Sequence, residues 1–204
     1  VLGLDEVDHK LKIKYKVRNI IDPNTNLFKK LKKYSKTFEP KYKPLLYDEA
    51  IITFEKKHGI RLSHYNLLIN ACGLQKGIDL SSRSRFCCNI EFGTSCWVVL
   101  TTVLPIYSGC IYDTIKPDLT FGYSKSDYVL RSDLRYIKSF NKNEIAICPE
   151  NSAALTIGKE PIHLTSYKTF NSFIRIKGHS VMLGYLDDMI NQKSYTNRGL
   201  NIPY

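Results

Sequence analysis

The chain has 204 residues, of which 43% are hydrophobic and 24% charged, and its formal net charge is +11. This length suits one domain, or one domain with a small appendage, and the composition excludes a broadly disordered chain. No apolar run is long enough to span a membrane. The six cysteines are too few for a disulfide scaffold and lack zinc-type spacing, so we expect buried free thiols in a reducing intracellular compartment.

The first predicted element is a β-strand over residues 10–18, where basic and apolar residues alternate. A strand sends successive side chains to opposite faces, so the apolar residues would face a core and the basic ones would stand in a row. The row consists of Lys10, Lys12, Lys14, Lys16 and Arg18.

Three helices are predicted after a turn at residues 22–24. Asn26 would cap the first, which carries Lys29, Lys30, Lys32 and Lys33 around an apolar side. The second covers 48–58 and ends at Gly59, and the third is capped by Ser63 and ends near Gly73.

From Arg85 onward, short apolar and β-branched runs are separated by turn residues, which is typical of strands. The predicted strands cover 85–92, 96–104, 106–112, 127–131, 134–140, 144–148, 154–157, 161–165, 172–177 and 180–186. The predicted fold class is therefore α+β, with a helical basic N-terminal third followed by a largely antiparallel β-rich region. We expect the division at residues 1–75 and 76–204, packed as one compact unit.

Two segments resemble the catalytic segments of papain-like cysteine peptidases. They are Gly93-Thr94-Ser95-Cys96-Trp97 and, 83 residues later, the run from Lys177 to Tyr185 that contains His179. The resemblance implies a hydrolase acting on a peptide substrate, with Cys96 as nucleophile and His179 as general base. It implies Asn197 as the residue that orients the imidazole, with Asp187 as a second candidate. No cofactor and no metal are expected.

Two further resemblances use overlapping residues. Residues 97–102, 143–147 and 161–164 are similar to the first barrel of a trypsin-like domain, but Leu104 and Glu144 stand where that family has its catalytic His and Asp, so no Ser-His-Asp triad could operate. Residues 184–189 resemble the Tyr-x-Asp-Asp hairpin of reverse transcriptases, whose carboxylates hold Mg²⁺. A strand followed by an acidic turn is the interpretation we favour for this last segment.

The alternative to a peptidase is a non-enzymatic basic protein that binds nucleic acid or another polyanion. The strand row and the four helix lysines would contact phosphates, and four tyrosines in the same third could stack on bases: Tyr15, Tyr34, Tyr42 and Tyr47. Such a protein could be a viral structural component. A lysine row also protects an exposed strand edge against aggregation, and this second interpretation stays open.

Overall fold

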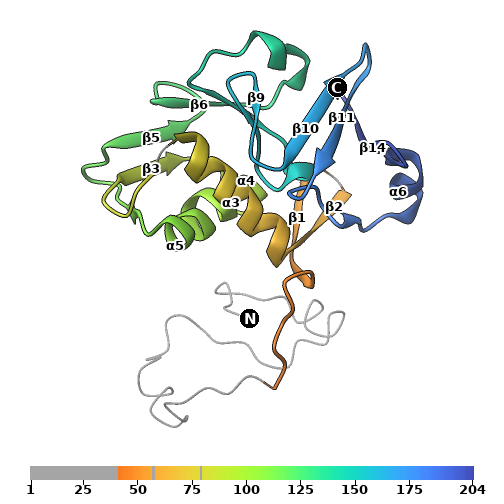
Figure 1. Cartoon of the computed structure of the whole chain (residues 1–204), viewed down its shortest axis with the longest axis horizontal. Coiled ribbons are helices and arrows are strands. Elements are labelled where there is room, and N and C mark those ends of the chain that lie inside the picture. Colours follow the sequence, from red (N-terminus) through yellow and green to blue (C-terminus); the bar gives the residue numbers. More distant parts are fainter. Residues whose placement is uncertain (1–40, 57, 79) are drawn as a thin grey trace, which may run out of the picture. The chain divides into compact units, whose positions relative to one another are not determined.

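The computed structural model of this chain describes residues 41–56, 58–78 and 80–204. Pro44–Tyr204 form one compact unit (Figure 1). The strand predicted over 10–18 and the first predicted helix lie outside the described residues. Within the described part of the chain, no helix is long and apolar enough to cross a membrane.

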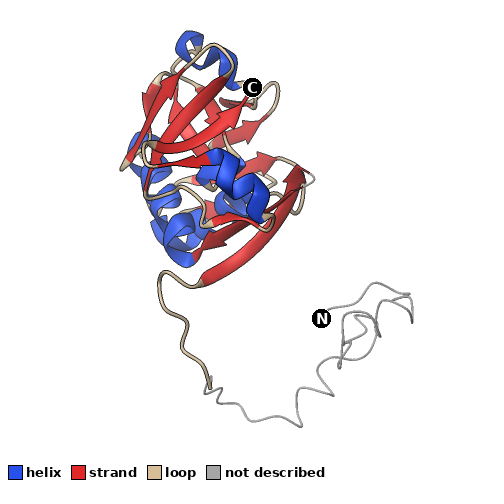
Figure 2. Cartoon of the chain, turned by 90° about the vertical axis from the view of Figure 1, so that its right-hand side faces the viewer, coloured by secondary structure: helices blue, strands red, loops and turns tan. Residues whose placement is uncertain are grey.

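Three sheets make up most of the unit, and short helices lie around them (Figure 2). The first sheet has the order β1 (Glu49–Lys56), β2 (His58–Ser63), β12 (Gly184–Tyr185). The second has the order β10 (Thr165–Thr169), β11 (Phe173–Gly178), β14 (Gly199–Pro203), β13 (Tyr195–Thr196). The third has the order β4 (Ile111–Tyr112), β3 (Arg85–Asn89), β5 (Leu119–Gly122), β6 (Tyr128–Arg131), β7 (Glu144–Ile147), β8 (Ala154–Ile157), β9 (Glu160–Pro161).

Seven of the eleven strand pairings in the described chain are antiparallel, so the predicted α+β class with a largely antiparallel β-rich region is confirmed. The other four pairings are consecutive and parallel, and they join β4, β3, β5, β6 and β7. Parallel strands end at the same edge of a sheet. The residues that follow β3, β5, β6 and β7 are therefore brought together from distant parts of the chain.

The helix α3 (His64–Ile78) begins as predicted, with Ser63 as its cap, but it continues past the predicted end near Gly73 to Ile78. The Ser63 hydroxyl accepts the backbone N–H of Asn66 at 3.1 Å, while the Asn66 side-chain oxygen accepts the backbone N–H of Ser63 at 3.0 Å. This reciprocal exchange satisfies two N–H groups at the helix start. The remaining helices are α4 (Ser95–Val98), η1 (Val99–Val103), α5 (Leu104–Ser108), η2 (Leu134–Ser139), η3 (Pro149–Asn151) and α6 (Asp188–Ser194).

The helix predicted over 48–58 is wrong, because this segment is the strand β1. It pairs antiparallel with β2, and the register of this pairing shifts between Thr53 and Lys56. β2 in turn pairs with β12, about 120 residues further along the chain. Pairing with distant strands decides the conformation here, and a local apolar spacing could not reveal it.

The strand predicted over 96–104 is also wrong, because α4, η1 and α5 form one continuous helical run. Cys96, Val99, Leu100 and Leu104 are all buried, and their positions at i, i+3, i+4 and i+8 share one face of a helix. Burial of this face outweighs the strand preference of the valines and threonines. Pro105 is accommodated because the preceding turn is widened to a π-helix, in which Leu104 donates its N–H to the Val99 carbonyl.

The core joins the third sheet to the helices. Phe86 of β3 and Phe121 of β5 are fully buried and meet edge to face, with ring centroids 5.7 Å apart. Leu67, Ala71 and Leu74 present the apolar side of α3 to the same core. The helical run after β3 and the helix α3 thus pack against the sheet in one shared core.

Candidate functional site

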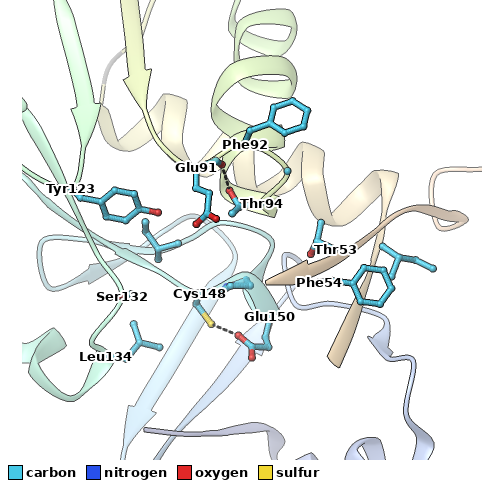
Figure 3. A pocket seen from close by; sticks show the side chains of 14 residues that line it. Thr53, Phe54, Glu91, Phe92, Thr94, Tyr123, Ser132, Leu134, Cys148 and Glu150 are labelled. Atoms are coloured by element: carbon cyan, nitrogen blue, oxygen red, sulfur yellow. Dashed lines mark hydrogen bonds between the residues drawn. The ribbon is translucent and has the colours of Figure 1, made fainter. Parts of the chain in front are cut away.

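A pocket lies at the carboxyl ends of the parallel strands (Figure 3). We call it the strand-end pocket; it is lined by residues 52–54, 91–94 and 147–150 with Tyr123, Ser132 and Leu134. Its volume is about 460 Å³, within the range of small-molecule sites. The carboxyl ends of parallel strands are where ligands bind in open α/β sheets, so the position of this pocket is itself evidence of a binding site.

One edge of the pocket is the start of the helical run. Gly93 has φ +83°, a conformation that non-glycine residues rarely adopt. It turns the chain from β3 into Thr94, whose hydroxyl accepts the backbone N–H of Trp97 at 3.0 Å and donates to the Glu91 carbonyl at 3.0 Å. The helix extends without a break to Ser108. Its N-terminal end therefore gives this edge a partial positive charge suited to an anion.

The loop after β7 supplies a buried carboxylate. Glu150 is 2% exposed, and its Oε1 accepts the hydroxyl of Tyr185 at 3.1 Å, while its Oε2 lies 3.5 Å from the Cys148 thiol. Burial, with a smaller contribution from the Glu150 charge, raises the pKa of Tyr185 far above its ordinary value. The same two causes raise the pKa of Tyr195 to about 12. Both tyrosines are therefore uncharged at neutral pH, and Tyr185 is a donor to the carboxylate.

Asn70 of α3 holds this loop in place. Its side chain is fully buried, and its Nδ2 donates to the carbonyls of Asn151 at 2.6 Å and Ala154 at 2.8 Å. Its Oδ1 accepts the backbone N–H of Ala154 at 3.1 Å. One side chain thus connects α3 to Asn151, which directly follows Glu150, and to Ala154 at the start of β8.

Thr53 on β1 provides an unusual polar group. The residue is 5% exposed, and its hydroxyl oxygen is buried without a hydrogen-bond partner in the described structure. Figure 3 shows Thr53 on one side of the pocket, with Glu91 and Tyr123 pointing into the same space from the segments that follow β3 and β5. A buried hydroxyl without a partner is costly, and a ligand that meets it would remove that cost.

The residues predicted as catalytic lie in different surroundings. Cys96 is 3% exposed in the hydrophobic core. Burial raises the pKa of the neighbouring Cys88 thiol, and Cys96 adds a smaller contribution in the same direction. His179 is exposed, and its Nδ1 is 2.7 Å from the hydroxyl of Tyr65. Asp187 caps α6 by accepting the backbone N–H of Met189 at 2.9 Å. None of these lines the strand-end pocket, and neither does Asn197, which lies in the turn between β13 and β14.

The Tyr-x-Asp-Asp segment begins as a strand, as we favoured, but a helix follows that strand instead of the acidic turn that we expected. Tyr185 belongs to β12, and the two aspartates begin α6. Across residues 41–56, 58–78 and 80–204, no three His, Cys, Asp or Glu side chains are grouped so as to hold a metal ion.

Sequence reasoning missed Thr53, Glu91 and Glu150. The sequence offered one signal for the two glutamates. The strands predicted over 85–92 and 144–148 lie close to β3 and β7, and Glu91 and Glu150 follow β3 and β7 in the structure. The prediction lacked the parallel pairing that brings these two strand ends to one edge.

Comparison with known proteins gives a clear similarity at the level of structure. No model of a known protein family and no curated protein matches the sequence. Solved structures with the same fold include McyG A-PCP complexed with phenylalanyl-adenylate (TM-score 0.67, 12% identity), which matches 94% of this chain and 44% of its own length. A long-chain-fatty-acid-CoA ligase from Archaeoglobus fulgidus is similar with a TM-score of 0.67 and 17% identity, over 89% of this chain and 53% of that one.

A third similar structure is the anthranilate CoA ligase AuaEII in complex with anthranoyl-AMP, with a TM-score of 0.67 and 10% identity. It matches 89% of this chain and 49% of its own length. This chain thus spans about half the length of the structures it resembles. At these identities the comparisons establish the fold.

This fold overturns the papain-like interpretation, and the hydrolase activity and peptide substrate that went with it, since the similar structures include CoA ligases and an adenylation domain. The physical reason lies in α4, where the proposed nucleophile is a core thiol on a helix face. The trypsin-like alternative fails too, because residues 97–102 are helical rather than a barrel strand.

The same comparisons overturn the basic nucleic-acid-binding or viral structural protein and its polyanion partner. The residues on which that interpretation rested lie outside the described structure: Lys10, Lys12, Lys14, Lys16, Arg18, Lys29, Lys30, Lys32 and Lys33. Of the four tyrosines, Tyr42 and Tyr47 are described; both are exposed, and the Tyr47 ring packs on that of Tyr65 with centroids 5.0 Å apart. What the similarity supports is a fold that, in two of the structures above, holds an acyl adenylate.

Proposed function

We propose that this chain belongs to an adenylate-forming enzyme and that its strand-end pocket binds an acyl adenylate. In such a reaction a carboxylate oxygen attacks the α-phosphorus of ATP, the bond to pyrophosphate breaks, and an acyl–AMP anhydride forms. The observation that carries the proposal is the placement of the pocket at the carboxyl ends of β3, β5, β6 and β7. The fold shared with structures that hold acyl adenylates supports it.

The polar groups of the pocket match the two halves of an adenylate. The phosphate is anionic, and the N-terminal end of the helical run at Gly93 and Thr94 favours an anion. The ribose offers hydroxyl donors, and Glu91 and Glu150 are carboxylate acceptors on other sides of the pocket. Thr53 adds a buried hydroxyl that still needs a partner. A ligand with one anionic and one hydroxyl-bearing part is therefore favoured over a simple anion, which the carboxylates would repel.

The direct test is calorimetric titration with non-hydrolysable adenylate analogues, in which an acyl sulfamate replaces the acyl phosphate. Phenylalanyl, anthraniloyl and long-chain fatty acyl versions cover three acyl classes. At least one is expected to bind saturably with a stoichiometry of one, and more tightly than adenosine or the free acid. If none of the three binds even at millimolar concentration, the proposed function is wrong.

A matched pair of variants locates the binding. Glu91→Gln removes one carboxylate from the pocket, and we expect the tightest analogue to bind it roughly tenfold more weakly, as for loss of a charged hydrogen bond. Asp188→Asn removes the same charge from the first turn of α6, outside the pocket, and should leave the affinity unchanged. Equal effects of the two substitutions would place the ligand elsewhere.

A further inference from the structure

A second pocket lies where the end of α3 meets two turns of the third sheet. We call it the lysine pocket; it is lined by residues 140–142 and 157–163 with Gly73, Lys76 and Gly77. Its volume is about 750 Å³, and it shares no lining residue with the strand-end pocket. It is therefore separate from the site proposed for an acyl adenylate.

Three lysines from three different elements line this pocket. Lys76 comes from α3, Lys142 from the turn before β7, and Lys159 from the β8–β9 turn. All three are exposed, and none forms an ion pair within the part of the chain that the structure describes. The one acidic side chain in the lining is Glu160. Three like charges repel one another, and a dianion placed among them would be attracted by all three.

A contact with His163 holds the Lys76 side chain in position. The Lys76 ammonium lies 3.1 Å from Nε2 of His163. An ammonium has only donors, so Nε2 is the acceptor in this contact. The contact holds Lys76 at the pocket edge and leaves its other two N–H groups able to bind a ligand.

The two turns that carry the other lysines are fixed to a single residue, Glu144. Its carboxylate accepts the backbone N–H of Asn141 at 2.7 Å, and its carbonyl accepts that of Gly158 at 2.7 Å. The hydroxyl of Thr156 also donates to the Gly158 carbonyl at 2.8 Å. Lys142 and Lys159 therefore project from turns whose backbones are held before any ligand arrives, which lowers the entropic cost of binding.

The lining between the lysines is apolar. Phe140 is 7% exposed and Ile162 is 4% exposed, so both present a small part of their surface to the pocket. Ile157 is partly buried beside them. A simple anion would leave this surface in contact with water, whereas an anion attached to an apolar body would cover it.

We propose that the lysine pocket binds a small phosphomonoester, with the phosphoryl group among the three lysines and an apolar body against Phe140 and Ile162. A phosphoryl group carries a charge of about −1.5 to −2 at neutral pH and has three acceptor oxygens. It therefore matches three ammonium donors in both charge and number.

The test compares phenyl phosphate with inorganic phosphate by calorimetry at fixed ionic strength. Phenyl phosphate is expected to bind saturably and more tightly than inorganic phosphate. The triple variant Lys76→Ser, Lys142→Ser and Lys159→Ser should lose roughly tenfold or more in affinity, because several charge-assisted contacts disappear. The control triple variant changes lysines outside the pocket and removes the same charge; it carries Lys116→Ser, Lys125→Ser and Lys193→Ser.

The control variant should bind phenyl phosphate within twofold of the unmodified protein. Equal losses in the two triple variants would show a general charge effect and overturn the proposal, as would the absence of saturable binding. Equal affinities for the two probes would overturn the apolar contact and leave a site for free phosphate. Glu91→Gln should leave phenyl phosphate binding unchanged, so failure of this proposal and failure of the proposed function can be told apart.

Discussion

Removing the unpaired hydroxyl of Thr53 should stabilise the protein, although most substitutions of buried residues destabilise. Thr53→Val replaces the hydroxyl with a methyl group of similar size on a strand, where both residues are well accommodated. Leaving a buried polar group without a partner costs roughly 1–3 kcal/mol, and the Thr53 hydroxyl is such a group. We expect Thr53→Val to raise the free energy of unfolding by about 1 kcal/mol, or about 2–4 °C in the unfolding temperature for a chain of this size.

Thr156→Val is the matched control. Thr156 is also on a strand and fully buried, but its hydroxyl donates to the Gly158 carbonyl at 2.8 Å. Its removal leaves that carbonyl without this donor, and it should lower the free energy of unfolding by about 1–2 kcal/mol. Urea unfolding followed by the fluorescence of Trp97, the single tryptophan, measures both variants. If Thr53→Val destabilises the protein as much as Thr156→Val does, the Thr53 hydroxyl has a partner and the reasoning fails.

Three further predictions concern the loop, the helix start and pH. Asn70→Ala removes three buried hydrogen bonds and should lower the free energy of unfolding by about 3 kcal/mol, measured by urea unfolding. Gly93→Ala meets no atom but places alanine at φ +83°, which should cost about 1 kcal/mol, and Gly93→Asn should cost less. Asp113 has its pKa lowered to about 2, mainly by its hydrogen bond with Arg85; the stability that this provides is present above pH 4 and lost as the pH falls from 4 to 2. Arg85→Gln should remove that part of the pH dependence, and an unchanged profile would contradict the assignment.

The same Thr53→Val variant connects stability to binding. If the hydroxyl is unpaired because it awaits a ligand, the variant should be more stable when free and should bind the acyl adenylate analogue more weakly, by roughly fivefold to tenfold for one lost hydrogen bond. A purely structural strain would give the first effect without the second. The two measurements together therefore test whether the cost of this hydroxyl serves binding.

Local patterns were sufficient where local interactions decide the structure. The helix α3 could be predicted because Ser63 and Asn66 cap it within three residues. The strands β7 and β11 could be predicted because short β-branched runs lie between turn residues. The β1 segment was misread because its pairing with β2 is irregular and its sheet is completed only by β12.

The candidate site could not be predicted, because it depends on the order of strands in a sheet. Glu91 and Glu150 are separated by almost sixty residues, and Thr53 comes from a different sheet. Glu91 follows β3, Glu150 lies in η3 after β7, and Thr53 lies within β1. Their significance arises only when β3, β5, β6 and β7 are parallel neighbours, and no pattern within one strand specifies its neighbours.

The segment from Gly93 to Trp97 attracted attention for its thiol, but it is Gly93 and Thr94 that line the strand-end pocket. Its side chains resembled those around a nucleophilic thiol, yet the Cys96 thiol is buried in the core. What this segment contributes to the pocket is its backbone: Gly93 makes the turn, and the Thr94 hydroxyl caps the helix that starts at the pocket edge. A glycine followed by a hydroxyl residue at the end of a strand also indicates a strand-to-helix turn. That interpretation would have predicted a binding edge without requiring any reactive side chain.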